Sequence, residues 1–126
     1  MIQFACVGLD HRHIYEMTEG LLAAGAECIG YFTRDDAEPL GGFIRRFPKV
    51  PCFESPEILY QRKDVSLIVC AGIPGERAEI CIQAMRHGKD VMVDKPGIIT
   101  QQQLRKVIQV RQETGARYSM SFPDHF

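Results

Sequence analysis

Two spacings of apolar residues alternate along this chain. Short apolar runs rich in strand-forming residues are separated by longer stretches in which apolar residues recur every three or four positions. The first pattern predicts β-strands and the second predicts amphipathic helices. The run at residues 65–71 has no polar alternation, which is typical of a strand that helices cover on both faces. We therefore expect strands at residues 2–7, 28–32, 50–53, 65–71, 90–93 and 117–121.

The first helical stretch shows its buried face and its end. Ile14, Met17, Leu21 and Leu22 have the spacing of one helix face, and Gly25 follows them as a stop signal. We expect the first helix between these limits.

Other helices carry clear boundary residues. Ser55 stands at a cap position before a proline, and Thr100 with Gln103 forms a capping box ahead of a helix that Gly115 ends. Further helices are predicted at residues 40–47 and 75–87.

Strands that alternate with helices indicate a parallel sheet joined by right-handed crossovers. We predict an α/β fold: a doubly wound, Rossmann-type parallel sheet in three αβα layers, formed as a single domain over residues 1–126. A length of 126 residues with 45% hydrophobic and 25% charged residues is ordinary for one globular domain.

Charge and cysteine content argue against several classes of protein. The net charge of -1 offers no footprint for nucleic acid or an anionic membrane, and no apolar run approaches the roughly 18 residues of a membrane span. No basic segment followed by an apolar one precedes the first strand, so we expect no signal peptide and a cytoplasmic location. The 5 cysteines contain no CxxC pair, which favours buried thiols over zinc ligands or disulfides.

The turn after the first strand is the first candidate site. In a dinucleotide-binding fold it carries G-x-G-x-x-G, which lets a pyrophosphate approach the amides of a helix N-terminus. Here Gly8 is the only one of the three glycines, and Asp10 and His13 occupy the other two positions. Asp10 would repel a diphosphate, whereas the basic side chains beside it could offset that charge. The candidate residues are Gly8, Leu9, Asp10, His11, Arg12 and His13. In the alternative reading Gly8 only makes the turn, Asp10 caps the helix and the histidines are solvated.

His11 and His13 also raise the question of a metal. Two histidines are fewer than the three protein ligands of a catalytic zinc. His87 and His125 are distant in sequence, and nothing places them near the pair. We therefore expect no metal.

The end of the second strand bears on the choice of coenzyme. An acid at this position would bind the ribose 2′-hydroxyl of NAD, but Thr33 stands there and Arg34 follows it. A hydroxyl with a guanidinium suits a 2′-phosphate, which tilts the prediction toward NADP. Asp35 and Asp36 come directly after, so if the strand ends a little later than assigned, an aspartate takes the acidic position and the prediction becomes NAD. A solvated turn is the other reading.

Three stretches further along the chain carry a resemblance to a known family. They are I-V-C-A-G-I-P at residues 68–74, A-E at 78–79, and G-K-D-V-M-V-D-K-P at 88–96. They resemble the N-terminal nucleotide domain of the glucose–fructose oxidoreductase / inositol dehydrogenase (Gfo/Idh/MocA) family. That domain shows an apolar strand, an A-T-P-N-x-x-H-like loop, a helix ending A-G-K-H, and then V-x-V-E-K-P. The likeness extends over essentially the whole chain.

The resemblance implies an NAD(P)-dependent oxidoreductase that acts on a sugar, a cyclitol or a related hydroxy compound by hydride transfer. The lysine of E-K-P lies beside the nicotinamide and the substrate in that family, and it matches Lys95 here. Asp94 matches the glutamate, and Ala71, Gly72 and Ile73 match the loop at the coenzyme. Independently of the family, a lysine at a strand tip can hydrogen-bond a substrate hydroxyl or alkoxide. The alternative is a surface lysine paired with Asp94.

The chain also departs from the family pattern. Two loop glycines are missing, residues 72–74 replace Thr-Pro-Asn, and Arg77 replaces the histidine. The family's second domain, which binds the substrate and supports oligomers, is absent from these 126 residues. We therefore expect the nucleotide domain of a larger enzyme, inactive by itself and free of membrane or nucleic-acid partners.

Two other classes compete with this reading. A degenerate, non-catalytic Rossmann-like sensor or interaction module would account for the broken glycine motif. A receiver domain would account for Asp10, Lys95 and Pro96. The receiver is disfavoured because residues 70–72 supply no phosphoacceptor aspartate at the tip of the central strand.

Overall fold

A computed structural model describes residues 1–121 of the chain. In chain order the elements are β1 (Gln3–Val7), α1 (His13–Ala23), β2 (Glu27–Phe32), α2 (Leu40–Arg46), α3 (Pro56–Gln61), β3 (Leu67–Cys70), the 3₁₀ turn η1 (Pro74–Glu76), α4 (Arg77–Arg86), β4 (Asp90–Asp94), α5 (Gln101–Thr114) and β5 (Tyr118–Ser121).

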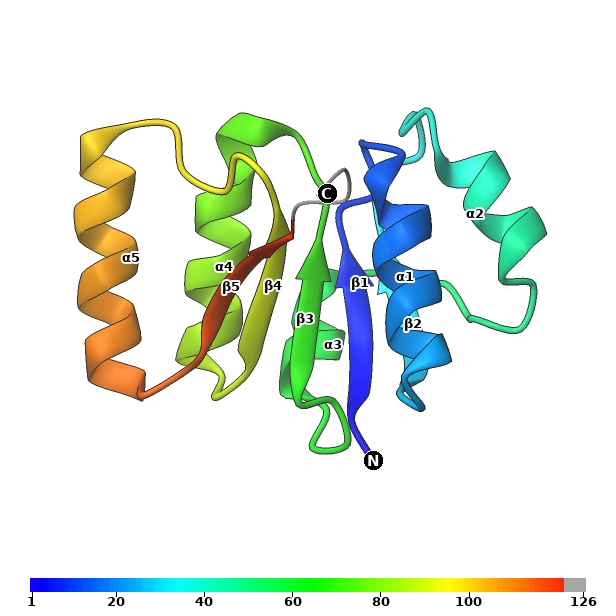
Figure 1. Cartoon of the computed structure of the whole chain (residues 1–126), viewed down its shortest axis with the longest axis horizontal. Helices are drawn as coiled ribbons and strands as arrows, with labels where there is room; N and C mark the ends of the chain where they lie inside the picture. The colour runs from blue at the N-terminus through cyan, green and yellow to red at the C-terminus, as the bar shows by residue number, and fades with distance from the viewer. Residues whose placement is uncertain (122–126) are drawn as a thin grey trace.

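The strands form one parallel sheet in the order β2-β1-β3-β4-β5 (Figure 1). The chain moves outward from β1 in one direction to β2 and in the other direction to β3, β4 and β5. The connections therefore reverse between β1 and β3, which is the topological switch point of the sheet. This arrangement confirms the predicted doubly wound fold.

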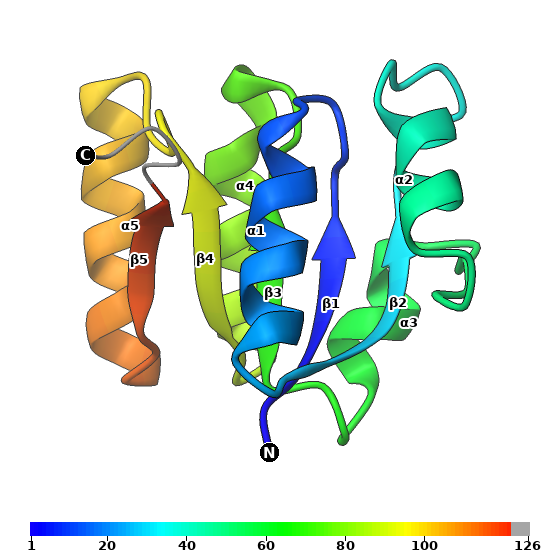
Figure 2. The same ribbon diagram turned by 45° about the vertical axis from the view of Figure 1, so that its right-hand side comes forward.

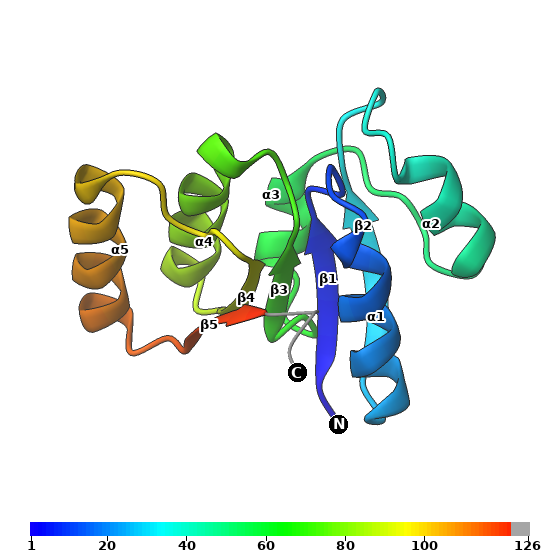
Figure 3. The same ribbon diagram turned by 45° about the horizontal axis from the view of Figure 1, so that its top comes forward.

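Helices cover both faces of the sheet. Phe4 and Cys6 of β1 pack with Ile14 of α1 and Phe43 of α2 in one apolar cluster. The opposite faces of β1, β3 and β4 pack against α3, α4 and α5 in a second cluster. Figure 2 shows α1 in front of the sheet and α5 behind β5, and Figure 3 shows the layers from above. One apolar cluster lies on each face of the sheet, between the sheet and the helices that cover it, so the helices and the sheet form the three predicted layers.

Most predicted helix boundaries are confirmed by cap geometry. The Ser55 hydroxyl accepts from the amide at the third position of α3, and Thr100 and Gln103 form the reciprocal capping box of α5. Gly115 ends α5 with φ of 73°, a left-handed conformation that favours glycine. In α1 one predicted position differs, because Leu22 is exposed while Ile14 and Met17 are buried.

The predicted strand at residues 50–53 is wrong. The segment forms a single parallel bridge between Tyr31 and Cys52. Tyr31 donates to the Pro51 carbonyl, and its own carbonyl accepts from Phe53. Pro51 has no amide hydrogen to contribute to a ladder, so pairing stops after one bridge. The helix predicted at 75–87 begins as the turn η1 and becomes α-helical at Arg77.

The cysteines are free thiols. Cys6, Cys70 and Cys81 are buried, and burial raises the pKa of Cys70 to about 12. Cys52 is exposed. In the described part of the chain, no helix is both long enough and apolar enough to cross a bilayer.

Candidate functional site

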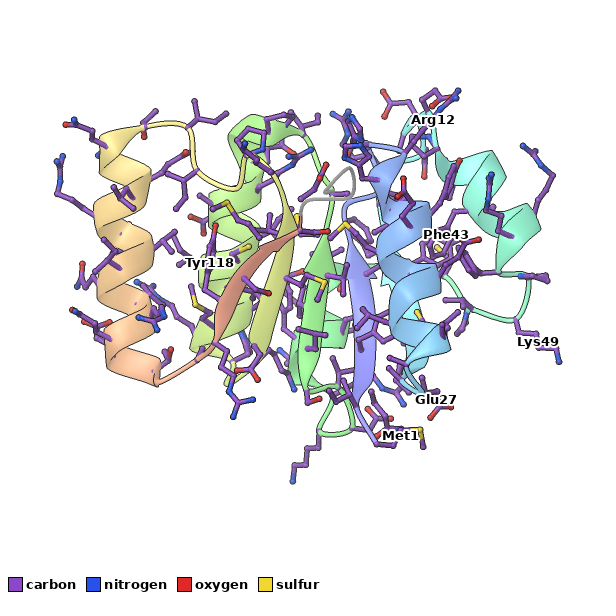
Figure 4. The ribbon with its side chains drawn as sticks, in the orientation of Figure 1. Met1, Arg12, Glu27, Phe43, Lys49 and Tyr118 are labelled. Carbon is purple, nitrogen blue, oxygen red and sulfur yellow. The ribbon has the colours of Figure 1, made fainter. Side chains whose placement is uncertain are left out.

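The candidate site lies at the edge of the sheet where the carboxyl ends of the strands meet. Figure 4 places Arg12 at this edge and Met1 and Glu27 at the opposite one. The loops after β1 and β3 are joined here, because the Ala71 amide donates to the Gly8 carbonyl at 3.0 Å. Open parallel sheets bind ligands at this edge, next to the switch point.

Gly8 lets these two loops touch. Its φ is +88°, and a Cβ on it would lie 2.8 Å from the Cα of Gly72. A side chain at position 8 would therefore force the loops apart as well as strain the backbone. The side chains of Leu9 and Ala71 are fully buried in the cluster around α1, so these residues present only backbone groups at the edge of the sheet.

Much of the loop's hydrogen-bonding capacity is already used within the protein. The Gly8 amide donates to the Phe32 carbonyl at 2.9 Å, and the His11 amide donates to the Ala71 carbonyl at 2.9 Å. The Leu9 amide donates to the Thr33 hydroxyl at 3.0 Å. Thr33 is buried and holds the loop in place, a role that the sequence did not indicate.

Asp10 does not cap α1. The helix begins after Arg12 with no side-chain cap. Asp10 instead accepts from Arg34 at 3.2 Å, and Arg34 also lies 3.7 Å from Asp36. The acid that replaces the second glycine is therefore paired with the arginine predicted to bind a 2′-phosphate. Arg34 is 49% exposed, so one of its faces remains open to solvent.

Arg12 points away from the loop toward the connection between β2 and α2. Its guanidinium donates to both carboxylate oxygens of Glu38, at 3.0 and 2.9 Å. This contact holds the pKa of Glu38 below its usual value. Both side chains are exposed, so the pair contributes little to stability.

Asp94 is the centre of the site. It is the last residue of β4, and its side chain is 1% exposed. His13 Nδ1 lies 3.0 Å from Asp94 Oδ1, and His11 Nδ1 lies 3.7 Å from Asp94 Oδ2. His11, His13 and Asp94 form the one group within residues 1–121 that brings together three metal-ligating side chains.

Arg77 supports Asp94 from the buried side. It is the first residue of α4, it is 1% exposed, and its Nη2 lies 3.4 Å from Asp94 Oδ2. It also donates to the carbonyls of Gly72 at 2.7 Å, Asp94 at 3.0 Å and Pro96 at 3.2 Å. Arg77 thus joins the loop after β3 to the loop after β4. In the sequence it stood out only as a departure from the family pattern.

Lys95 follows Asp94 at the same edge and is exposed. Its peptide bond to Pro96 is cis. Ile73 lies half-buried in the loop after β3. The fold therefore brings the predicted residues of the first turn and of the strand tip together at one edge. His125 lies outside the described residues.

These residues fit a nicotinamide dinucleotide. The Gly8–Gly72 contact leaves no side chain between the two loops, and Arg34 is half exposed at the end of β2. A helix N-terminus at the switch point of a parallel sheet is where doubly wound α/β domains bind nucleotides. The family model for the oxidoreductase family with an NAD-binding Rossmann fold matches residues 2–122. The chain belongs to this Gfo/Idh/MocA family and forms its NAD(P)-binding domain.

Solved structures agree with this assignment. A protein classed as an oxidoreductase from Erwinia carotovora atroseptica SCRI1043 is 39% identical, with a TM-score of 0.91 over 95% of this chain and 36% of that one. A protein from Desulfitobacterium hafniense DCB-2, classed as an NADPH-dependent oxidoreductase, is 22% identical (TM-score 0.83; 95% and 34% covered). Biliverdin reductase of Synechocystis sp. PCC 6803, solved with biliverdin and NADP⁺, is 19% identical (TM-score 0.82; 95% and 37% covered). The last two show the fold alone.

The chain spans about a third of the length of these solved proteins. No curated protein matches it.

Proposed function

We propose that the chain is the nucleotide-binding part of an oxidoreductase that transfers a hydride between NADP or NAD and a small hydroxy compound such as a sugar or cyclitol. Family membership supports the oxidoreductase class and the coenzyme type. The substrate class is inferred from the family resemblance. A biliverdin reductase has the same fold, so the fold also occurs in proteins with substrates other than sugars or cyclitols.

One contact carries the proposal. The 3.0 Å contact between His13 and Asp94 joins the turn after β1 to the tip of β4, 81 residues away in sequence. Lys95, the next residue, therefore lies at the same edge of the sheet as the turn after β1. When bound there, the nicotinamide supplies or accepts the hydride. Lys95 would hydrogen-bond the substrate oxygen and stabilise the charge that develops on it.

Arg34 supports a preference for NADP. A guanidinium offers a planar set of donors that matches a phosphate, and this one is half exposed at the end of β2. It is paired with Asp10, so a 2′-phosphate would share or displace that carboxylate. NAD carries only a neutral 2′-hydroxyl at this position, which attracts a guanidinium less strongly than a phosphate does.

Coenzyme binding tests this proposal on the 126-residue chain itself. NADPH and NADH are titrated separately, and binding is followed by the coenzyme's own emission because the chain has no tryptophan. We expect saturable binding of both. Arg34→Ala should weaken NADPH binding by about 10- to 150-fold, because a hydrogen bond to a charged group is worth about 1.5–3 kcal/mol, and should leave NADH binding nearly unchanged. Arg45→Ala, an exposed arginine on α2, is the matched control. Equal losses for both coenzymes would contradict the role of Arg34.

The role of Lys95 is tested in the longest natural chain that carries these residues, since we expect the 126-residue chain alone not to turn over. Lys95→Met should lower kcat by about 10²–10³, the effect of removing one oxyanion donor, with coenzyme affinity retained. Lys106→Met, an exposed lysine on α5, is the control. Unchanged turnover in Lys95→Met would remove this residue from the mechanism.

One observation favours a non-catalytic module instead. The amides of Gly8, Leu9 and His11 already donate within the protein, which leaves fewer donors for a pyrophosphate. If neither NADPH nor NADH binds at millimolar concentration, the non-catalytic module is the better interpretation.

A further inference from the structure

We propose that His11, His13 and Asp94 bind one divalent first-row transition ion of the Zn²⁺ class. The ligand atoms of these residues all lie within 4.8 Å of one another. Two imidazoles and a carboxylate are a common ligand set for such ions, and three protein ligands leave the fourth position open to water or another oxygen. The two-histidine objection to a metal no longer holds, because the fold adds a third ligand that is remote in sequence.

The carboxylate of Asp94 is the first independent sign of a missing partner. Its Oδ2 atom is buried and has no hydrogen-bond partner within the described residues. Buried polar atoms in native proteins are nearly always satisfied, and an exception calls for a cause such as a water or an ion. This oxygen forms an ion pair with Arg77 Nη2 at 3.4 Å, lies 3.7 Å from His11 Nδ1, and accepts a hydrogen bond from neither. A metal ion between Asp94 Oδ2 and His11 would supply the missing contact.

The two histidines are prepared to act as ligands. His11 Nδ1 accepts a hydrogen bond from the His13 amide at 3.1 Å, so this nitrogen is unprotonated, and a metal bound through it would replace that hydrogen bond. The ring centroids lie 4.1 Å apart and the planes are inclined by 47°. The side chains of His11 and His13 are 50% and 31% exposed, which gives an ion a path from solvent.

The distances are close to those of a tetrahedral site. Ligands about 2.0–2.2 Å from zinc lie about 3.4 Å from one another. His13 Nδ1 lies 3.0 Å from Asp94 Oδ1 and His11 Nδ1 lies 3.7 Å from Asp94 Oδ2, and the ligand atoms of the three residues all lie within 4.8 Å of one another. A small rotation of the exposed imidazoles is enough to reach the metal geometry.

Arg77 is the charged group that bears most directly on this site. Its Nη2 lies 3.4 Å from Asp94 Oδ2, and three of its contacts go to main-chain carbonyls behind the carboxylate. Arg77 therefore fixes the orientation of Asp94, as outer-sphere partners of metal ligands do. Its positive charge lowers the affinity of the site, and it shares Asp94 Oδ2 with His11, whereas Oδ1 lies 3.0 Å from His13 Nδ1.

Metal binding is measured apart from coenzyme binding, because an ion held by His13 and Asp94 would replace the hydrogen bond between them. The 126-residue chain, freed of metal by a chelator, is titrated with ZnCl₂ in a calorimeter, and Co²⁺ is added in parallel to record its visible spectrum. We expect one equivalent of Zn²⁺ to bind, and Co²⁺ to show the bands of nitrogen and oxygen ligation without thiolate charge transfer.

Variants assign the ligands. His11→Ala and His13→Ala should each weaken Zn²⁺ at least tenfold, an effect that even outer-sphere changes can reach. Both side chains are partly exposed, so the fold should survive, and circular dichroism checks this. His87→Ala and Cys52→Ser, which alter an exposed histidine and an exposed thiol outside the cluster, should leave the affinity unchanged.

Three results would overturn the proposal: no binding of Zn²⁺ by the parent chain, unchanged affinity in His13→Ala, or loss of binding in Cys52→Ser. The first would leave His13 and Asp94 as a hydrogen-bonded pair that only ties two loops together. Because coenzyme binding is measured without metal, either proposal can fail while the other stands.

Discussion

Replacing Arg77 by methionine should destabilise the domain through the loops of the site. The guanidinium is 1% exposed and is surrounded by acceptors on two connections, the loop after β3 and the loop after β4. Methionine fills much of the same volume and removes every donor. The Asp94 carboxylate, also 1% exposed, then remains buried without its cation.

The magnitude follows from these contacts. A buried carbonyl that loses its donor costs about 1–3 kcal/mol, and removing one partner of a buried ion pair costs about 3–5 kcal/mol. The contributions overlap because one side chain supplies all of them and water can reach the exposed edge. We expect a loss of about 4 kcal/mol in the free energy of unfolding. Since the free energy of unfolding of a domain is about 5–15 kcal/mol, the variant should still fold but with a small remaining stability.

Urea unfolding followed by far-ultraviolet circular dichroism measures this loss. With an m-value of about 2 kcal/mol/M, the midpoint should fall by about 2 M. Arg86→Met, an exposed arginine in the last turn of α4, should change stability by less than about 0.5 kcal/mol. Adding Asp94→Asn to Arg77→Met should restore part of the lost stability, because the neutral asparagine side chain leaves no unpaired buried charge.

Two outcomes would refute this reasoning. A loss below about 1 kcal/mol in Arg77→Met would mean that water replaces the guanidinium at little cost. A double variant whose loss equals the sum of the two single losses would mean that Arg77 and Asp94 are not energetically coupled.

Three further predictions concern groups away from the site. The Lys89 ammonium donates to two main-chain carbonyls at 2.6 Å each, so Lys89→Met should cost about 2–3 kcal/mol in urea unfolding, against almost nothing for the exposed Lys63→Met. The Tyr118 hydroxyl is buried with no partner within residues 1–121, so Tyr118→Phe should stabilise by up to about 1 kcal/mol. Burial raises the pKa of Tyr118, so the folded state keeps a proton that the unfolded chain releases above about pH 10; the gain from Tyr118→Phe should therefore grow as pH rises past that point. A thiol reagent should modify exposed Cys52 in the native protein and buried Cys70 only after unfolding.

Much of the fold was predictable because its signals are local. Ser55, Thr100 and Gly115 mark helix ends through contacts within a few residues, so the sequence alone locates them. The uniformly apolar run that became β3 indicated a strand covered on both faces. The segment at 50–53 failed because strand propensity does not reveal whether a ladder partner exists, and Pro51 removes a donor.

The site was predictable only as separate pieces. The glycine turn at Gly8, the arginine after β2 and the Asp94–Lys95 pair were all recognisable, since each is a short motif at a strand end. The role of Arg77 was not, because a buried arginine is identified by the carbonyls around it and these come from two loops.

The sequence by itself determined the succession of strands and helices, the family and the identity of the residues at each strand end, since periodicity, caps and motifs are properties of neighbouring residues. Only the tertiary structure decided that Asp10 pairs with Arg34 across 24 positions and that His13 meets Asp94 across 81. Such pairs depend on the order of strands in the sheet. That order arises from packing between distant segments, and no local pattern encodes it.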